Sequence, residues 1–420
     1  MSTPSCLKFA VLGLALCSQS LLADNWPEWR GPHGDGVSTE TALPLTWSAT
    51  ENVKWSVALP ERGNSTPVIW GDRIFVTQAV GPRRTVMCFD RKKGDLLWQE
   101  GPSSSQPEKT HDTNPYCSAS PVTDGERVVA WFGSAGVYCW DMKGAEQWHV
   151  DLGKQEHIWG YAASPVLLGD LCIVNFGPGE RSFLVALNKK NGKEAWRTET
   201  PPPTVWEGAG AGQKWSGSWT TPVVLKTTKG NQLVLGYPGA VRGYDPATGK
   251  ELWHCDGLNP LVYANPLIAD DIVVGMGGFG GSALGVKIGA TGDLTPQRLW
   301  QLKTSSQRIG SGVVKDGMIY MTNAPGVVQC IDPKDGKVLW QERAKTPSNR
   351  GSSWSSLTLA GDRLYLVNQA SETAVLKAGP QFEQLAANAL DGALSNSSVA
   401  ISNGEIFIRT HKRLWCIGAK

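Results

Sequence analysis

Cys88-Phe-Asp90-x-x-x-Gly94-x-x-x-Trp98 is a segment whose pattern returns several times along this chain. Clear copies are Ala186-Leu-Asn188-x-x-x-Gly192-x-x-x-Trp196, Tyr244-Asp245-x-x-x-Gly249-x-x-x-Trp253 and Cys330-Ile-Asp332-x-x-x-Gly336-x-x-x-Trp340. Each copy is typical of a strand, a tight turn and a second strand. The tryptophans recur roughly every 40 to 57 residues, a period that indicates a chain of repeats.

The segments between these copies predict two further strands in each repeat. A small residue and a proline, as in Ser65-Thr66-Pro67, come before a short apolar run, and proline at a strand's first residue loses no ladder hydrogen bond. Turns such as Gly71-Asp72 then lead into alternating runs such as residues 73–77, which are hairpin signals. Four antiparallel strands in each repeat predict a propeller blade.

The number of repeats predicts how the ring closes. The last repeat ends without a fourth strand, and residues 52–55 are expected to supply it, which removes exposed sheet edges. We therefore predict an all-β fold, an eight-bladed β-propeller of four-stranded antiparallel blades over residues 47–420, after an N-terminal extension at residues 24–46. The expected blade starts are Ser65, Ser118, Ala163, Thr220, Ala264, Gly310, Ser355 and Ser397.

The periodic tryptophans have a structural explanation that needs no ligand. A large indole on an outer strand packs against the adjoining blade and buries on the order of 200 Å². The residues expected to dock blades in this way are Trp55, Trp98, Trp148, Trp196, Trp253, Trp300 and Trp340.

Residues 1–23 contain a single charge and an apolar run that fades towards Ala23, which is typical of a cleaved secretory signal. We expect a periplasmic or secreted protein with no transmembrane segment in the mature chain. Lipidation at Cys17 stays open, although Leu16 before it is not small. Seven cysteines follow the signal, and those at the repeated strand position are expected to be core residues. A net charge of +2 gives no reason to expect nucleic acid as a partner, and a monomer is expected.

The Asp-x-x-x-Gly-x-x-x-Trp repeats, with first strands that open on Ser-x-Pro, resemble those of the pyrroloquinoline-quinone-type propeller family. The resemblance implies either a quinone-dependent dehydrogenase or a non-enzymatic outer-membrane assembly factor. The dehydrogenases of that family hold the quinone against vicinal cysteines beside a calcium ion, and this chain has no adjacent cysteine pair. The size of the chain is nearer to that of the assembly factor. We expect no cofactor and no metal site, with PQQ and calcium kept as an alternative.

Function in a propeller usually sits on the loops of one face, held by a rigid scaffold. The segments leading into two of the first strands, residues 101–116 and 201–217, are longer than ring closure requires. Polar and aromatic residues gather on these lead-in segments and would suit a planar ring, a sugar or an extended peptide. The alternative is that the indoles plug the channel. The candidates are His111, Asn114, Trp159, Tyr161, Trp215, Trp219, Arg308, Arg350 and Trp354.

Gly275-Met-Gly277-Gly-Phe-Gly280 matches the dinucleotide fingerprint G-x-G-x-x-G after a predicted strand. The residues that follow it are typical of another strand, so no helix N-terminus would receive a pyrophosphate. We therefore predict a hairpin turn at this segment.

The leading hypothesis is an exported, non-enzymatic binding or scaffolding propeller that engages its ligand or partner on the face with the long loops. The partner would be a protein, an extracellular glycan or a small molecule. The alternatives are a PQQ-dependent oxidoreductase of alcohols or sugars with a divergent site, and a glycan-binding propeller.

Overall fold

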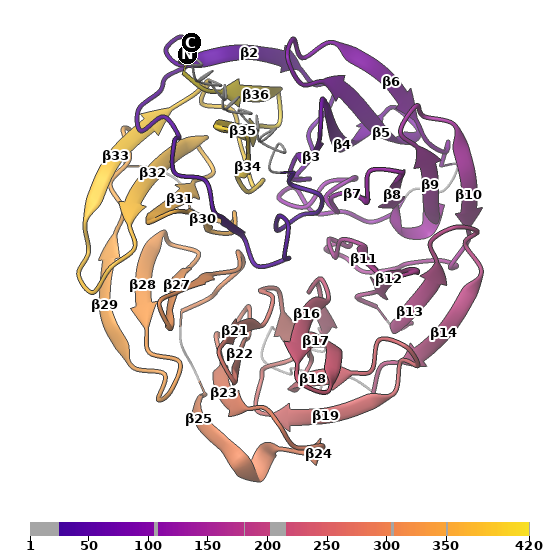
Figure 1. The fold of residues 1–420 in the computed structure, drawn as a ribbon, viewed down its shortest axis with the longest axis vertical. Coiled ribbons are helices and arrows are strands. Elements are labelled where there is room, and N and C mark those ends of the chain that lie inside the picture. The colour runs from indigo at the N-terminus through magenta and orange to yellow at the C-terminus, as the bar shows by residue number, and fades with distance from the viewer. Residues whose placement is uncertain are drawn as a thin grey trace, which may run out of the picture.

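The computed structural model describes residues 25–104, 108–179, 181–201, 216–303, 306–349 and 352–419. Small antiparallel sheets stand around a central axis (Figure 1). The predicted all-β propeller of eight blades is confirmed. The expected signal, residues 1–23, lies outside the described residues and stays a prediction.

The strands of each blade follow one another from the axis to the rim. The first four blades are β3 (Val68–Trp70), β4 (Arg73–Val80), β5 (Arg83–Asp90) and β6 (Leu96–Glu100); β7 (Val122–Thr123), β8 (Arg127–Trp131), β9 (Val137–Asp141) and β10 (Glu146–Val150); β11 (Val166–Leu168), β12 (Leu171–Phe176), β13 (Phe183–Asn188) and β14 (Glu194–Glu199); and β16 (Val223–Thr227), β17 (Gly230–Tyr237), β18 (Ala240–Tyr244) and β19 (Glu251–Asp256).

The remaining blades keep the same order, and the last takes its outer strand from the N-terminal region. They are β21 (Leu267–Ala269), β22 (Ile272–Met276), β23 (Ala283–Lys287) and β25 (Arg298–Leu302); β26 (Val313–Lys315), β27 (Met318–Thr322), β28 (Val327–Ile331) and β29 (Val338–Arg343); β30 (Thr358–Ala360), β31 (Arg363–Val367), β32 (Glu372–Lys377) and β33 (Gln384–Ala389); and β34 (Ala400–Ser402), β35 (Glu405–Arg409), β36 (Arg413–Ile417) and β2 (Val53–Ala58).

A few short elements lie outside this plan. Two short strands add to blades in parallel: β1 (Val37–Ser38) pairs with β30, and β24 (Gly292–Asp293) pairs with β19. β15 (Gly217–Ser218) pairs with β20 (Leu261–Val262) near the axis. The two 3₁₀ turns are Gly133–Ala135 and Thr295–Gln297.

The repeated Asp-x-x-x-Gly segment forms the turn between the third and fourth strands. In the first blade, Asp90 Oδ1 accepts the backbone N–H groups of Lys92 and Lys93, at 3.0 and 2.8 Å. Gly94, at φ +76°, donates its N–H to Asp90 O and takes a left-handed conformation that favours glycine. The aspartate and the glycine of the pattern are therefore both requirements of this turn.

The periodic tryptophans lie between blades. Trp55 packs over Gly94 of the next blade, where a Cβ would lie 2.7 Å from the indole, and its Nε1 donates to Arg91 O at 2.8 Å. Equivalent indole N–H bonds to the following blade are made by Trp98, Trp148, Trp196, Trp300 and Trp340. Trp253 differs, because its Nε1 donates to Gln232 of its own blade, at 2.8 Å.

The buried cysteines fill the spaces between blades. Cys88 packs with Phe75 of its own blade and with Val128 and Trp140 of the next one. Each of the seven described cysteines is buried and free, so the prediction of core thiols is confirmed for the described part of the chain.

A circular relay of hydrogen bonds joins the inner ends of all eight blades. In each blade, one Ser, Thr or Asn donates its backbone N–H to the side-chain oxygen of its counterpart in the next blade. We call these the ring residues, and each is at most 6% exposed. The bonds are Thr66 to Ser120 (2.9 Å), Ser120 to Ser164 (2.9 Å), Ser164 to Thr221 (2.9 Å), Thr221 to Asn265 (2.9 Å), Asn265 to Ser311 (2.9 Å), Ser311 to Ser356 (2.9 Å), Ser356 to Ser398 (3.0 Å) and Ser398 to Thr66 (3.2 Å).

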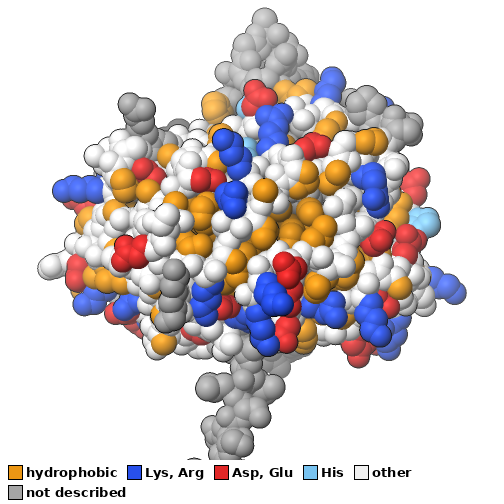
Figure 2. Space-filling model, turned by 90° about the horizontal axis from the view of Figure 1, so that it is seen from above, with side chains coloured by type: hydrophobic (Ala, Val, Ile, Leu, Met, Phe, Trp, Pro, Cys, Tyr) orange, Lys and Arg blue, Asp and Glu red, His pale blue; other side chains and the backbone are white. Residues whose placement is uncertain are grey.

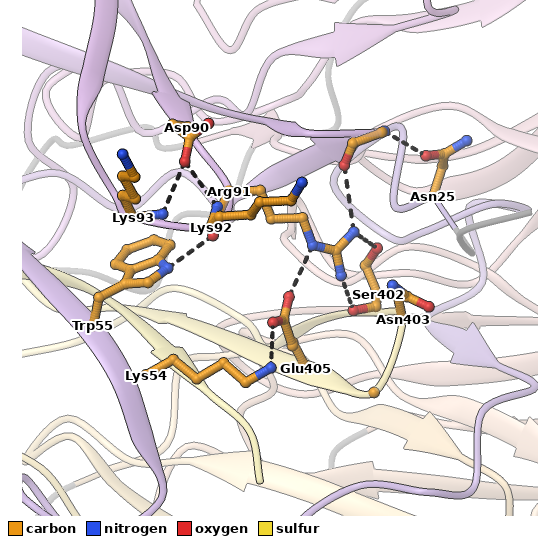
Figure 3. Close-up of polar contacts among 12 residues, drawn as sticks. Asn25, Lys54, Trp55, Asp90, Arg91, Lys92, Lys93, Ser402, Asn403 and Glu405 are labelled. Carbon is orange, nitrogen blue, oxygen red and sulfur yellow. Dashed lines mark hydrogen bonds and ion pairs between the residues drawn. The ribbon is translucent and has the colours of Figure 1, made fainter. Parts of the chain in front are cut away.

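The first and last blades are also joined at the rim (Figure 3). β2 pairs with β36 in antiparallel register, as predicted from the missing fourth strand. Glu405 accepts from Arg91 Nε and Lys54 Nζ, each at 2.8 Å, while Arg91 also donates to Ser402 Oγ at 2.9 Å. Because Arg91 belongs to the first blade and Glu405 to the last, this buried ion pair fixes the junction where the ring closes.

The outer surface carries charges of both signs. Figure 2 shows the rim beside β2, where Lys and Arg side chains lie among Asp, Glu and hydrophobic groups without forming one continuous basic field. This distribution agrees with the small net charge of +2.

Candidate functional site

The central channel holds a cavity of about 460 Å³ at the end of the propeller where the lead-in segments arrive. Every blade contributes to its wall the residue that comes two positions before its ring residue. We call these the wall residues. In blade order they are Asn64, Ser118, Ala162, Trp219, Tyr263, Ile309, Trp354 and Asn396.

The wall residues divide the cavity into two chemical halves. Blades four to seven present Trp219, Tyr263, Ile309 and Trp354, whereas the other blades present two asparagines, a serine and an alanine. In a ring of eight, each blade faces the fourth one along, so that Trp219 faces Asn396 and Tyr263 faces Asn64. A ligand in the cavity therefore meets an aromatic half on one side and a half with amide and hydroxyl groups on the other.

The turn at His157–Gly160 adds Trp159 to the aromatic half. Trp219 Nε1 donates to Gly160 O at 3.0 Å, and Asn114 Nδ2 donates to Trp159 O at 2.6 Å. Gly160, at φ +65°, takes the left-handed conformation that the turn requires. Two side chains of the cavity wall thus hold the turn that carries a third.

His157 fixes this turn from behind. Its Nδ1 accepts the backbone N–H of Trp159 at 3.2 Å, and its ring meets the Trp219 ring edge-on with centroids 5.0 Å apart. Burial lowers the pKa of His157 to about 4, so the imidazole is neutral near pH 7 and can accept this bond.

The polar half is held by a network that spans three blades. Asn64 and Asn396 both donate through Nδ2 to Thr113 O, at 2.8 and 2.9 Å. Asn64 Oδ1 is 3.1 Å from His411 Nε2, and burial together with nearby Arg409 and Arg62 lowers the pKa of His411 to about 4. The asparagines are therefore held in place before any ligand arrives.

The N-terminal segment, residues 25–38, closes the other side of the cavity. It crosses the axis between the first and seventh blades (Figure 1), and its Trp29 lines the cavity. Trp26 exchanges two backbone hydrogen bonds with Ile69, at 2.9 and 2.8 Å. Arg30 donates to Leu357 O at 2.7 Å and to Gly312 O, in the seventh and sixth blades. Trp29 thus forms a floor attached to several blades.

Five of the nine sequence-derived candidates line the cavity: His111, Asn114, Trp159, Trp219 and Trp354. Their role in binding stays a prediction. The structure places two others away from the cavity. Tyr161 packs on Trp131 with centroids 4.7 Å apart, and Arg308 is buried and donates to Gln329 at 3.0 Å. Trp215 and Arg350 lie outside the described residues.

The sequence analysis missed several lining residues: Trp29, Asn64, Phe279, Gln307 and Asn396. Asn64 and Asn396 occupy the wall position, and a comparison of the repeats two residues before each ring residue would have found them. Phe279 comes from the hairpin between β22 and β23, where the predicted turn in place of a dinucleotide fingerprint is confirmed. Trp29 follows from the path of the N-terminal segment, which no repeat predicts.

The described lining carries no Asp, Glu, Lys or Arg side chain. Nor do the described residues contain a group of three or more His, Cys, Asp or Glu side chains that could hold a metal ion. In the same part of the chain, no helix is long and apolar enough to cross a membrane.

Comparison with known proteins identifies the family. The sequence profile of the outer membrane protein assembly factor BamB matches residues 37–176, 82–342 and 239–420. This chain belongs to that family of PQQ-like repeat propellers. The match covers nearly all the described residues, in agreement with the repeats seen in the sequence.

The similar curated proteins are larger enzymes. Quinohemoprotein alcohol dehydrogenase ADH-IIG of Pseudomonas putida is 30% identical over 179 residues, which cover 38% of this chain and 23% of that protein. Polyvinylalcohol dehydrogenase of Pseudomonas sp is 23% identical over 379 residues, which cover 82% of this chain and 55% of that protein. The chain thus spans only part of the length of the relatives it matches.

Solved structures share the fold at low identity. A europium-containing methanol dehydrogenase superposes with a TM-score of 0.71 at 10% identity, covering 94% of this chain and 98% of that one. BamB from Moraxella catarrhalis superposes with a TM-score of 0.58 at 15% identity, covering 87% and 99%. Because enzymes and an assembly factor share this architecture, the fold alone does not assign an activity.

Proposed function

We propose that this chain is an exported, non-enzymatic binding propeller that holds a neutral, polyhydroxylated ligand of the carbohydrate class in its central cavity. The observation that carries the proposal is the division of the wall into an aromatic half and an amide half. A sugar ring has apolar faces that stack on indoles and hydroxyl edges that bond amides, so it matches both halves at once. The described lining has no Asp, Glu, Lys or Arg, which favours a ligand without charge, because a buried ion without a partner is costly.

The same lining is a poor match for the quinone cofactor of the dehydrogenases. Pyrroloquinoline quinone is a tricarboxylate, and the described lining offers it no arginine or lysine. Calcium sites in proteins usually include carboxylate oxygens, and the described lining has none. The cavity therefore supports binding of a neutral ligand better than quinone-dependent oxidation, which remains the second candidate because curated relatives are dehydrogenases.

The proposal is tested by titrating purified protein with neutral oligosaccharides while intrinsic tryptophan fluorescence and binding heat are measured. We expect saturable binding to at least one sugar series. Trp354→Ala should weaken this binding roughly tenfold, the equivalent of about 1.4 kcal/mol. Leu299→Ala, at an exposed site on the outer strand β25, is the matched control and should leave binding unchanged.

A parallel arm tests the enzymatic alternative. Protein supplied with PQQ and calcium is assayed for dye reduction over a panel of alcohols and aldoses. Turnover with stoichiometric quinone binding would overturn the proposal. If no sugar binds but a soluble peptide library yields a peptide whose binding is abolished by Trp354→Ala, the partner is a protein instead.

Export is part of the same proposal. The family includes an outer membrane assembly factor, and residues 1–23 carry the features expected of a secretory signal. Cell fractionation should find the protein in the periplasm or the medium, and retention of the unprocessed chain in the cytoplasm would contradict this localisation.

A further inference from the structure

The aromatic half of the cavity forms a wall that runs across the third, fourth and fifth blades. Trp159 and Trp219 have ring centroids 6.0 Å apart, and those of Trp219 and Tyr263 are 5.0 Å apart. The backbone of Gly278 lies against the Tyr263 ring, since a Cβ at Gly278 would be 2.1 Å from it. Phe279 follows directly. These contacts make one continuous wall from Trp159 to Phe279.

Large apolar side chains are exposed at both ends of this wall. Phe279 is 42% exposed while also lining the cavity, and Ile158, the neighbour of Trp159 in sequence, is 40% exposed. Among the described residues, the other large exposed apolar side chains lie on the outermost strands β6, β25 and β29. The end of the propeller where the cavity opens thus has its own exposed apolar surface, next to the mouth.

Phe279 is held in this exposed place by its backbone. Asn259 Nδ2 donates to Phe279 O, and Gly281 donates its N–H to Gly278 O at 3.1 Å, which closes the hairpin. Ser282 Oγ, from the same hairpin, donates to Asn259 Oδ1 at 2.9 Å. A large apolar side chain on a fixed turn loses little conformational entropy when a ligand covers it, which favours a binding role.

We propose that the ligand is a linear neutral oligosaccharide whose terminal sugar enters the cavity and whose following sugars lie along the wall between Phe279 and Ile158. The inference depends on the proposed carbohydrate function. Its added content is the chain length, since a single sugar would fill the cavity and leave the outer wall uncovered.

The test is a length series, from mono- to hexasaccharide, of cello-, malto-, xylo- and chito-oligosaccharides, measured by calorimetry. In the series that binds, we expect affinity to rise at least tenfold between the mono- and the trisaccharide. Ile158→Ala, at a position outside the cavity lining, should reduce this gain and keep the monosaccharide affinity, whereas the double variant Phe279→Ala and Ile158→Ala should lose the gain altogether. Leu299→Ala, which is 43% exposed on the rim, should behave like wild type.

The outcomes separate the inference from the function on which it rests. If sugars bind with an affinity independent of length, or if the double variant keeps the full gain, the chain-length inference is wrong and the cavity function stands. If no sugar of any length binds, both fall. Circular dichroism of the variants shows whether they fold, and the exposed positions are not expected to affect folding.

Discussion

Replacing Thr221 with valine removes one acceptor from the ring relay while keeping the shape of the side chain. Thr221 Oγ1 accepts the backbone N–H of Ser164 at 2.9 Å, and Thr221 is only 6% exposed. In the valine variant this buried N–H loses its partner, which costs about 1–3 kcal/mol. Thr221 does not line the cavity, so the change reports on the scaffold alone.

The expected loss converts into a measurable shift in melting temperature. Unfolding entropy is about 2.1 cal/mol/K per residue, so about 0.9 kcal/mol/K for a chain of this size, and the shift is about 1–3 °C. Calorimetry measures this shift, and hydrogen exchange at the Ser164 amide should become faster. Thr221→Ser keeps the hydroxyl and should preserve slow exchange at that amide. The reasoning is refuted if valine leaves both stability and exchange unchanged, or if serine speeds exchange as much as valine does.

Three further predictions concern the wall and the N-terminal segment. Thermal stability should fall as the pH decreases from 6.5 towards 4, because protonated His157 can no longer accept the hydrogen bond from Trp159 N–H. His157→Gln should make the melting temperature less sensitive to pH over that range, and an unchanged pH profile in the variant would contradict this. Burial and nearby Asp35 raise the pKa of Glu28 to about 8, so the folded state loses stability as the pH rises through that value. Glu28→Gln should therefore melt higher than wild type at pH 9 and close to it at pH 5, and equal melting at both would count against a buried acid. Arg30→Met removes bonds to two blades and should speed hydrogen exchange over residues 25–38 and weaken sugar binding, while unchanged exchange would refute the anchoring role.

The fold could be read from the sequence because its signals are local. The turn at Asp90 and Gly94 needs only its own residues, and the blade count followed from the starts of the first strands, which are equally local signals. The prediction of closure succeeded for a similar reason, since the last blade visibly lacks a strand and residues 52–55 have the right pattern. Trp253 departs from the docking pattern because β24 and its flanking turn replace the glycine turn of the next blade.

The cavity was harder to predict because each wall residue is located by its distance from a ring residue, and the ring residues can be recognised in only some of the repeats. The ring residues of the first five blades come before proline, but Ser311, Ser356 and Ser398 do not, so the common position is hidden in three blades. Tyr161 and Arg308 are within three residues of wall residues, yet they point into the interior. The presence of an aromatic or charged residue in a lead-in segment therefore does not show that its side chain reaches the channel.

The residues of the relay, which join the blades, differ from the wall residues, which determine the chemistry of the cavity. Because backbone N–H groups and short side chains hold all eight ring residues, the residue two positions earlier is placed on the channel whatever its side chain. Exchange of wall residues can thus change what the cavity binds without removing a bond of the ring relay. In this chain, large apolar residues occupy four adjacent blades and small or polar ones the other four. A cavity that only needed to be plugged would gain nothing from that separation, whereas a ligand with an apolar face and a polar edge requires it.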